Sequence, residues 1–454
     1  MRYPKKTMKA VHHLRGWRRK NISRYSVMFI LAVAVGFVAG FCAFLLKKAI
    51  ALVSDLATSG LSMARENWQL PVFPILGIVL TGIFVRYVVK LDITKGTNKM
   101  LKQLKAHNYI IKARVMVSPM IGAILTLGFG GSAGSEGPIA YTGGAIGSNT
   151  ARLFGLRPEL QRVLLGCGAA AGIAGIFKSP IGGFLFALEV LRITMTTSAV
   201  VALLTASVTA GATAYVMSGC TFDMAFGGTH AYQSGLLPWY CLLGLVSGLY
   251  DYYYSHVMDR MDRGFQRIKN PWIRNVAGGT ILAVCLFAFP SLYGEGYDVM
   301  ARILSGDVMS LVEGGLFRDL EGLWLIAGSA AAICLIKPFA ASSTNSAGGV
   351  AGDFAPTLYA GCMVGVVYAM LLRHWGLDIP VSDFAYLGMG AVMSGAIRAP
   401  LMAMFIVLEM TATFTLFWPM LIVTALSYFV VRLCTPDDFY ALRPRPRYYP
   451  TSTE

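Results

Sequence analysis

Several stretches of this chain run for more than twenty residues without a charged side chain. Three of them extend from Ser26 to Leu46, from Thr196 to Phe222 and from Thr411 to Val431. About 20 apolar residues in a helix cross the ~30 Å hydrocarbon core of a bilayer, so each stretch is long enough to span a membrane. Hydrophobic residues make up 56% of the chain and charged residues 14%, against roughly 45–50% and 25% in soluble proteins. The sequence therefore predicts an all-α polytopic membrane protein.

Basic residues crowd both ends of the chain, whose formal net charge is +16. Nine Lys and Arg residues precede the first apolar stretch and four follow the last one. By the positive-inside rule we expect both termini in the cytoplasm, with the protein in the cell membrane and an even number of crossings. The arms contain no recognisable nucleic-acid-binding module, so we expect them to attract anionic lipid headgroups of the bilayer and not nucleic acid.

The first apolar stretch is longer than the core of a signal peptide, so we expect it to stay in the mature protein. The eight cysteines are scattered without paired spacing. This distribution predicts small buried side chains, and neither a disulfide framework nor a metal site. We expect no cofactor.

The sequence contains an internal repeat. Ser179–Glu189 resembles Ala399–Glu409, with the same spacing between an early proline and a final glutamate. Upstream, Gly134–Pro138 corresponds to Gly352–Pro356, each a glycine followed four positions later by a proline. Because both pairs are separated by nearly the same offset, two halves of one ancestral unit are the simplest explanation.

This repeat divides the chain into four parts. Residues 1–24 form a basic cytoplasmic arm, 25–222 and 223–431 form two membrane repeats, and 432–454 form a final short helix and tail. Interrupted helices at corresponding places in two repeats predict a transport site at the interface of the repeats, near the middle of the bilayer.

The two glycine–proline motifs are expected to begin helices inside the membrane. Proline is well tolerated in the first turn of a helix, where its missing N–H costs nothing. Free N–H groups and the positive end of the helix dipole make such a terminus an anion site without a formal positive charge. Two termini aimed at one point would form a partial cage for a halide.

The runs Gly134–Pro138, Gly352–Pro356 and Ile397–Thr411 are similar to motifs of the CLC family of chloride channels and chloride–proton antiporters. The resemblance implies an inverted-repeat helical bundle whose broken helices meet at a midplane anion site, in a homodimer with one pore per subunit. The chain stops shortly after Tyr440, so the cytoplasmic nucleotide-binding module of many relatives is not expected. The anion-binding groups that the resemblance implies lie at Gly134, Ser135, Gly137, Asp353, Phe354, Ala355 and Tyr440.

The resemblance also makes Glu136 the gating glutamate, whose carboxylate competes with the anion for its site and leaves when it is protonated or displaced. The residue itself agrees with this role, because a carboxylate at membrane depth is costly and marks a functional site by default. An N-terminal capping acid is the plainer alternative. For Tyr440 the alternative is a place in the aromatic belt. Glu189 and Glu409 are expected to bond to backbone or to a facing helix.

The sequence departs from the family at several places. Val190 stands where many CLC antiporters carry a second, proton-relaying glutamate, which weakens the case for proton coupling without excluding it. Thr94–Asn98 replaces the family's Gly-Ser-Gly-Ile-Pro filter, with Lys95 or, after a one-residue slip, Thr94 opposite the serine. We expect Lys95 at the cytoplasmic interface, where it attracts anions; in the pathway it would bind an anion tightly. Asp353 would repel an anion unless its side chain points away.

Two other classes of function fit the sequence less well. Gly130–Gly134 matches the nucleophile-elbow pattern G-x-S-x-G around Ser132, but no histidine lies inside a clear apolar stretch to act as its base. A carrier of a small organic anion would need a roomier cavity than two converging helix ends. We therefore predict transport of small inorganic anions, chloride first, and no enzymatic activity. Analogy to compact CLC proteins favours a chloride/proton antiporter over a passive channel.

Overall fold

The computed structural model describes residues 24–59, 69–222, 224, 234–312 and 323–435. The helices of the first half are α2 (Arg24–Thr58), α3 (Val72–Ile83), α4 (Gly96–Lys105), α5 (Ser118–Gly128), α6 (Glu136–Leu153), α7 (Pro158–Phe177), α8 (Pro180–Leu185) and α9 (Thr197–Met217). The helices of the second half are α10 (Leu237–Arg267), α11 (Pro271–Ala288), α12 (Tyr297–Leu304), α13 (Leu323–Ser346), α14 (Phe354–His374), α15 (Val381–Ile397), α16 (Pro400–Met410) and α17 (Phe417–Cys434).

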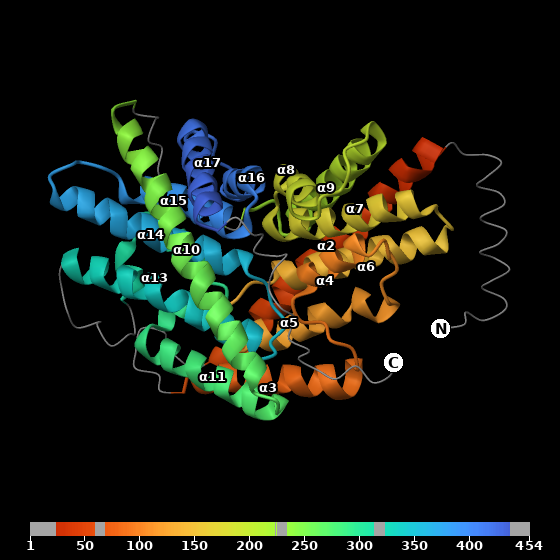
Figure 1. Cartoon of the computed structure of the whole chain (residues 1–454), viewed down its shortest axis with the longest axis horizontal. Coiled ribbons are helices and arrows are strands. Elements are labelled where there is room, and N and C mark those ends of the chain that lie inside the picture. The colour runs from red at the N-terminus through yellow and green to blue at the C-terminus, as the bar shows by residue number, and fades with distance from the viewer. Residues whose placement is uncertain (1–23, 60–68, 223, 225–233, 313–322, 436–454) are drawn as a thin grey trace.

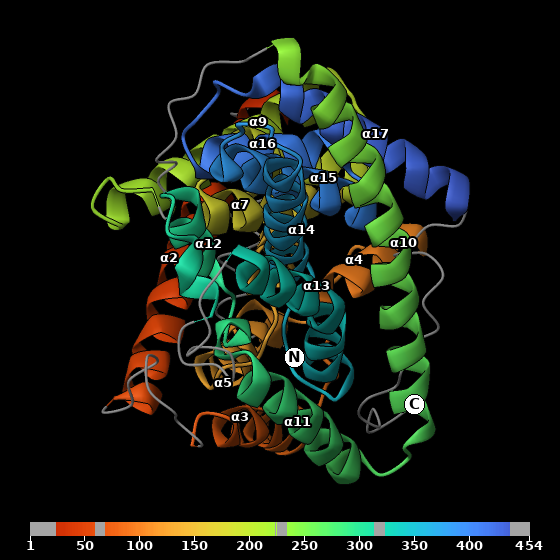
Figure 2. The ribbon, with the colours of Figure 1, turned by 90° about the vertical axis from the view of Figure 1, so that its left-hand side faces the viewer.

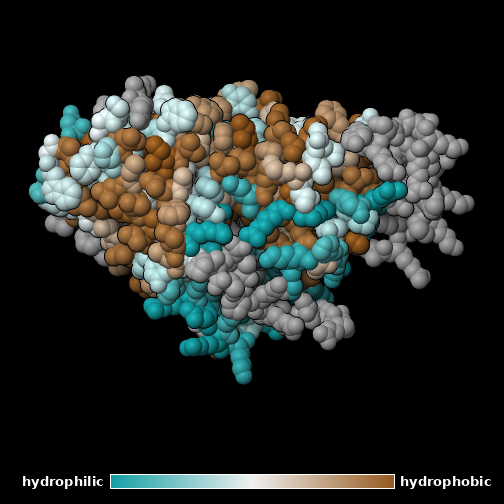
Figure 3. Space-filling model, turned by 45° about the horizontal axis from the view of Figure 1, so that its top comes forward, coloured by the Kyte–Doolittle hydropathy of each residue, from teal (hydrophilic) through white to brown (hydrophobic). Residues whose placement is uncertain are grey.

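Eight helices within the described ranges are long and apolar enough to cross a membrane. The uncharged stretch after Ser26 lies in α2, which continues to Thr58 and includes charged residues near its end. The side chains of Phe29, Phe37 and Phe41 on α2 are exposed, and Figure 3 shows wide apolar areas on the molecular surface. A surface of this kind belongs in lipid, and the protein is a multi-pass membrane protein.

The two halves of the chain pack in corresponding ways. In the first half α6 packs on α7 and α2 packs on α9, while in the second half α14 packs on α15 and α10 on α17. Figure 1 shows the first half on the right and the second on the left, with α8 and α16 between them. Figure 2 looks onto the second half, which the long α10 crosses from end to end. The molecule is an inverted-repeat helical bundle, as predicted. The boundary at residues 222 and 223 stays a prediction, since part of that region lies outside the described ranges.

The first half caps a broken helix of the second half with a glutamate. Glu189 lies in the π-helical turn Phe186–Val190, which continues α8. Its carboxylate accepts hydrogen bonds from the backbone N–H groups of Leu401 at 3.3 Å and Met402 at 2.8 Å, at the start of α16. Those N–H groups have no partner within their own helix, so a facing carboxylate satisfies them and complements the helix dipole.

The second half returns the same contact. Glu409, near the end of α16, accepts hydrogen bonds from the backbone N–H groups of Ile181 at 2.9 Å and Gly182 at 3.0 Å. It also accepts one from the Ser179 hydroxyl at 2.5 Å. The prediction that both glutamates bond to the backbone of a facing helix is confirmed, and their exchange joins the two halves along α8 and α16.

Replacing Glu409 by alanine should lower the thermal unfolding midpoint of the purified protein in detergent. The change leaves three donors without their acceptor, and hydrogen bonds to a charged group contribute about 1.5–3 kcal/mol each. Glu159→Ala is the matched control, because Glu159 is an exposed acid in the first turn of α7. Equal midpoints for the two variants would contradict a capping role for Glu409.

Candidate anion site

The N-terminal ends of α6 and α14 meet inside the protein. Gly134 and Gly352, the first residues of the two repeated motifs, form an isolated antiparallel bridge. The Gly134 N–H donates to the Gly352 carbonyl at 3.0 Å, and the Gly352 N–H donates to the Gly134 carbonyl at 2.6 Å. The helices then begin at Glu136 and Phe354. The structure therefore brings the two motifs together and confirms that each one begins a helix.

Glu136 reaches from the first turn of α6 to the first turn of α14. Its Oε1 atom accepts hydrogen bonds from the Phe354 N–H at 2.5 Å and from the Ala355 N–H at 3.2 Å. The residue is 1% exposed, and its Oε2 atom has no hydrogen-bond partner among the described residues. A carboxylate therefore occupies the place where two backbone amides and the helix dipole can hold an anion.

Glycine is needed on both sides of the bridge because the Glu136 carboxylate lies against the backbone there. A Cβ atom added at Gly352 would lie 2.5 Å from Oε1 of Glu136, and one added at Gly134 would overlap Oε2. A side chain at either position would push the carboxylate away from the α14 amides. Neither glycine has a positive φ, so close approach, not backbone conformation, explains the repeated glycine.

The other predicted anion-binding residues surround this carboxylate. The Ser135 N–H donates to Oε1 of Glu295 at 2.7 Å. The Asp353 carboxylate accepts a hydrogen bond from the side-chain amide of Asn345 at 2.6 Å, which gives this acid a partner other than the α14 amides. The N–H of Gly134 is engaged in the bridge, so Gly134 contributes close approach and not a free donor.

A small cavity of about 20 Å³ lies beside the bridge and is lined by Lys95, Gly137 and Gly352, among others. The Lys95 ammonium donates to Oδ2 of Asp262 on α10 at 2.6 Å, and the two side chains are 11% and 3% exposed. A buried carboxylate therefore holds the Lys95 ammonium. The place of Lys95 at the cytoplasmic interface stays a prediction.

Thr94 does not take the place of Lys95. Its hydroxyl donates to Oδ1 of Asp92 at 2.7 Å, and the residue is 1% exposed. The Asp262 carboxylate, in contrast, accepts hydrogen bonds from both the Lys95 ammonium and the Ser346 hydroxyl. Of the two candidates for the filter position, Lys95 is the one that lines the cavity.

Lys95→Met should lower the thermal unfolding midpoint strongly, because it leaves Asp262 buried without its cation. Loss of one partner of a buried ion pair costs about 3–5 kcal/mol, whereas replacement of both partners by uncharged residues can be nearly neutral. Lys95→Met with Asp262→Asn should therefore regain most of the loss.

Arg302→Met is the control for this experiment, since the Arg302–Asp307 pair has side chains 45% and 41% exposed. An exposed pair contributes about 0–1 kcal/mol. The ion-pair interpretation is refuted if the Lys95 single variant is as stable as the double variant.

A buried lysine near the site is absent from the sequence-based predictions. Lys337, inside α13, is 0% exposed. Its ammonium donates to the Ser132 hydroxyl at 2.9 Å and lies 4.5 Å from the centroid of the Tyr359 ring. One basic residue inside an apolar helix is the sequence signal that marks such a position. Its charge lies beside the segment that leads to Glu136.

The contact with Lys337 also bears on the nucleophile-elbow pattern. The basic group beside Ser132 is this lysine and not a histidine. Ser132 is 0% exposed. The pattern therefore marks a buried contact between the two halves of the chain.

Val190 and Tyr440 are the two remaining positions that the sequence predicts to matter for transport. Val190 ends the π-helical turn after α8 and is 6% exposed. Tyr440 lies outside the described residues, and its role in anion binding stays a prediction.

Two inverted helical halves, whose broken helices meet at a buried carboxylate, define a membrane transport protein with its site at the repeat interface. The chain belongs to the voltage-gated chloride channel family, whose model matches residues 77–432.

Individual relatives and a solved structure of this family are also similar to the chain. The chain is 27% identical over 396 residues to a putative chloride channel protein, ClcB-like, of Ralstonia nicotianae, covering 86% of this chain and 88% of the relative. It is 28% identical to the H(+)/Cl(-) exchange transporter ClcA of Klebsiella pneumoniae, covering 87% and 83%. The crystal structure of a slow cyanobacterial Cl⁻/H⁺ antiporter superposes with a TM-score of 0.77 at 22% identity, over 93% of this chain and 97% of that one. This structural likeness shows the fold.

Proposed function

We propose that this protein exchanges chloride for protons across a cell membrane, and that Glu136 couples the two movements. The observation that carries the proposal is the Glu136 carboxylate on the amides of Phe354 and Ala355. The similarity to a relative named as an H(+)/Cl(-) exchange transporter supports it.

The coupling follows from competition between two anions for one set of amides. An ionised carboxylate and a chloride ion are both stabilised by free N–H groups at a helix N-terminus. Protonation removes the negative charge of Glu136, so the neutral carboxyl group is displaced and chloride takes its place. Loss of the proton restores the charge, and the carboxylate returns to the amides as the chloride leaves. Each time chloride and the Glu136 carboxylate exchange places on the amides, Glu136 therefore gains or loses one proton.

The groups that coordinate chloride in this proposal belong to both halves. The amides of Phe354 and Ala355 are those that Glu136 occupies, and the amides of Ser135 and Gly137 lie on the facing terminus. The backbone of Asp353 and the hydroxyl of Tyr440 complete the proposed set. Lys95 contributes to the cavity beside the site, with its charge balanced by Asp262.

A passive chloride channel is the second candidate, and Val190 is the observation that favours it. A valine cannot carry a proton, and its position is buried at the end of the turn after α8. A channel would use Glu136 as a gate without moving a proton in each cycle.

We also propose a homodimer with one pathway in each subunit and with both termini in the cytoplasm. The family resemblance supports the dimer. The basic residues that crowd both ends of the chain support the orientation. The four-part division of the chain stays part of this proposal.

Liposomes that contain the purified protein test the function. A chloride gradient across the wild-type membrane should drive protons uphill, in the direction opposite to chloride. In Glu136→Gln, chloride should still flow while proton movement is lost, because glutamine cannot release a proton. Chloride efflux and external pH are recorded together. Chloride flow without uphill proton movement in the wild type would establish the channel, and no chloride flow would refute both candidates.

A further inference from the structure

A second carboxylate reaches the backbone next to Glu136. Glu295 lies in the loop between the 3₁₀ turn Pro290–Leu292 and α12. The glycines on each side of it, Gly294 and Gly296, have φ values of 68° and 82°, a conformation that glycine adopts at little cost. The loop directs Glu295 to Ser135, whose N–H donates to its Oε1 atom at 2.7 Å.

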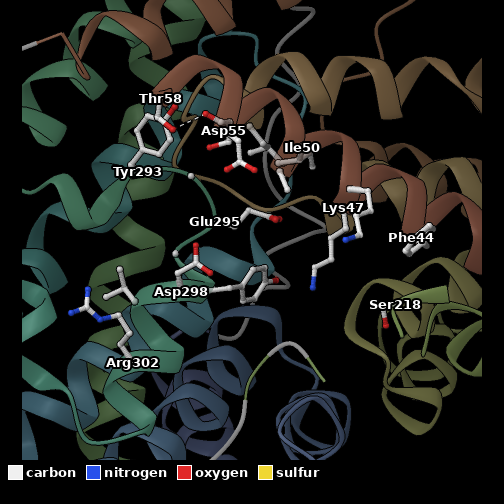
Figure 4. Close-up of a pocket in the computed structure, with 18 of the residues that line it drawn as sticks. Phe44, Lys47, Ile50, Asp55, Thr58, Ser218, Tyr293, Glu295, Asp298 and Arg302 are labelled. Atoms are coloured by element: carbon white, nitrogen blue, oxygen red, sulfur yellow. Dashed lines mark hydrogen bonds between the residues drawn. The ribbon is translucent and has the colours of Figure 1, made fainter. Parts of the chain in front are cut away.

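Glu295 also lines a cavity that is larger than the one beside Lys95. This cavity, which we call the vestibule, has a volume of about 620 Å³ and is lined by parts of α2 and α12 and by the loop before α12. It shares no lining residue with the small cavity beside Lys95. Figure 4 shows Glu295 between Tyr293 and Lys47, with Asp298 and Arg302 on the neighbouring element. The Glu295 carboxylate therefore lines the vestibule and contacts the segment that carries Glu136.

The vestibule is lined by charges of both signs besides Glu295. The other charged residues that line it are Lys47, Lys48, Lys178, Arg302, Asp55 and Asp298. Four of these are cations and two are acids. Arg302 is paired with Asp307, which leaves three lysines against Asp55, Asp298 and Glu295. Loss of the charge of Glu295 would therefore leave the cations in excess, and an excess of positive charge concentrates anions. Glu295 places a negative charge at the point where an anion would leave the vestibule for the α6 terminus.

Glu136 and Glu295 hold adjacent parts of one backbone segment. Glu136 takes the α14 amides, and its Oε2 atom lies over Gly134. Glu295 accepts a hydrogen bond from the backbone N–H of Ser135, the residue between Gly134 and Glu136 in the chain. The two carboxylates interact electrostatically. Glu295 thus lines the vestibule and contacts the residue next to Glu136, whose own carboxylate holds the α14 amides.

We propose that Glu295 is a second gating carboxylate, which occupies the Ser135 amide and must take up a proton or move aside before an anion passes between the vestibule and Glu136. The inference rests on the proposed anion transport. It places two carboxylate gates in series, one from each half of the chain. Protonation of Glu295 removes its charge, so anion passage through this second gate should increase as the pH falls.

The Glu136→Gln background isolates this second gate, because glutamine at position 136 does not titrate. Chloride flux is measured in liposomes at equal internal and external pH, from about pH 4 to about pH 7, across the range in which carboxyl groups titrate. The Glu136→Gln variant should pass about tenfold more chloride at about pH 4 than at about pH 7. A tenfold change corresponds to about 1.4 kcal/mol of repulsion between Glu295 and the anion. Glu136→Gln with Glu295→Gln should show high flux at every pH.

Two further variants make the test specific. Glu136→Gln with Asp298→Asn should keep the tenfold change, because Asp298 lines the same vestibule but is exposed in the first turn of α12. Glu295→Ala in the same background should behave like Glu295→Gln, and a monodisperse elution profile checks that each variant is folded. A flux in Glu136→Gln that does not change with pH overturns the second gate. So does a pH dependence that survives the loss of Glu295. Absence of chloride flux in every form would instead refute the proposed function.

Discussion

The bridge between Gly134 and Gly352 is the contact on which the site depends. Two backbone hydrogen bonds hold the motifs of the two halves face to face, and the absence of side chains there lets a carboxylate lie against both strands of the bridge. Glu136 of one half can then reach the amides of the other half. The proposed anion site is thus built from backbone dipoles, which carry no formal charge that would bind a halide too tightly to release.

The charged side chains near the site are each balanced in a different way. Lys95 is paired with a buried carboxylate on α10, and Lys337 is held by the Ser132 hydroxyl and the Tyr359 ring. Glu295 accepts a hydrogen bond from a backbone amide and lines a vestibule that carries charges of both signs. These charged side chains are therefore held by specific partners.

Local motifs predicted the architecture, whereas long-range polar contacts escaped prediction. The glycine–proline spacing predicted where α6 and α14 begin, and the places of Glu189 and Glu409 near the ends of apolar runs indicated bonds to backbone or to a facing helix. The partner of Lys95 is 167 residues away in the chain, and that of Ser135 is 160 residues away. Neither contact has a periodic pattern, since each joins a loop or a helix end to a single polar residue. Such pairings depend on the packed arrangement of the halves.

The exchange of glutamate caps has a consequence for the order of assembly. The start of α8 receives its carboxylate from Glu409, which is synthesised 227 residues after Gly182. Until that residue emerges, the first half has a helix end in lipid whose amides lack their partner, and unsatisfied amides are costly there. The first half is therefore incomplete while the ribosome is still at work. Final docking of the two halves must wait for the last part of the chain, and a shortened product would expose an open helix end by which quality control can recognise it.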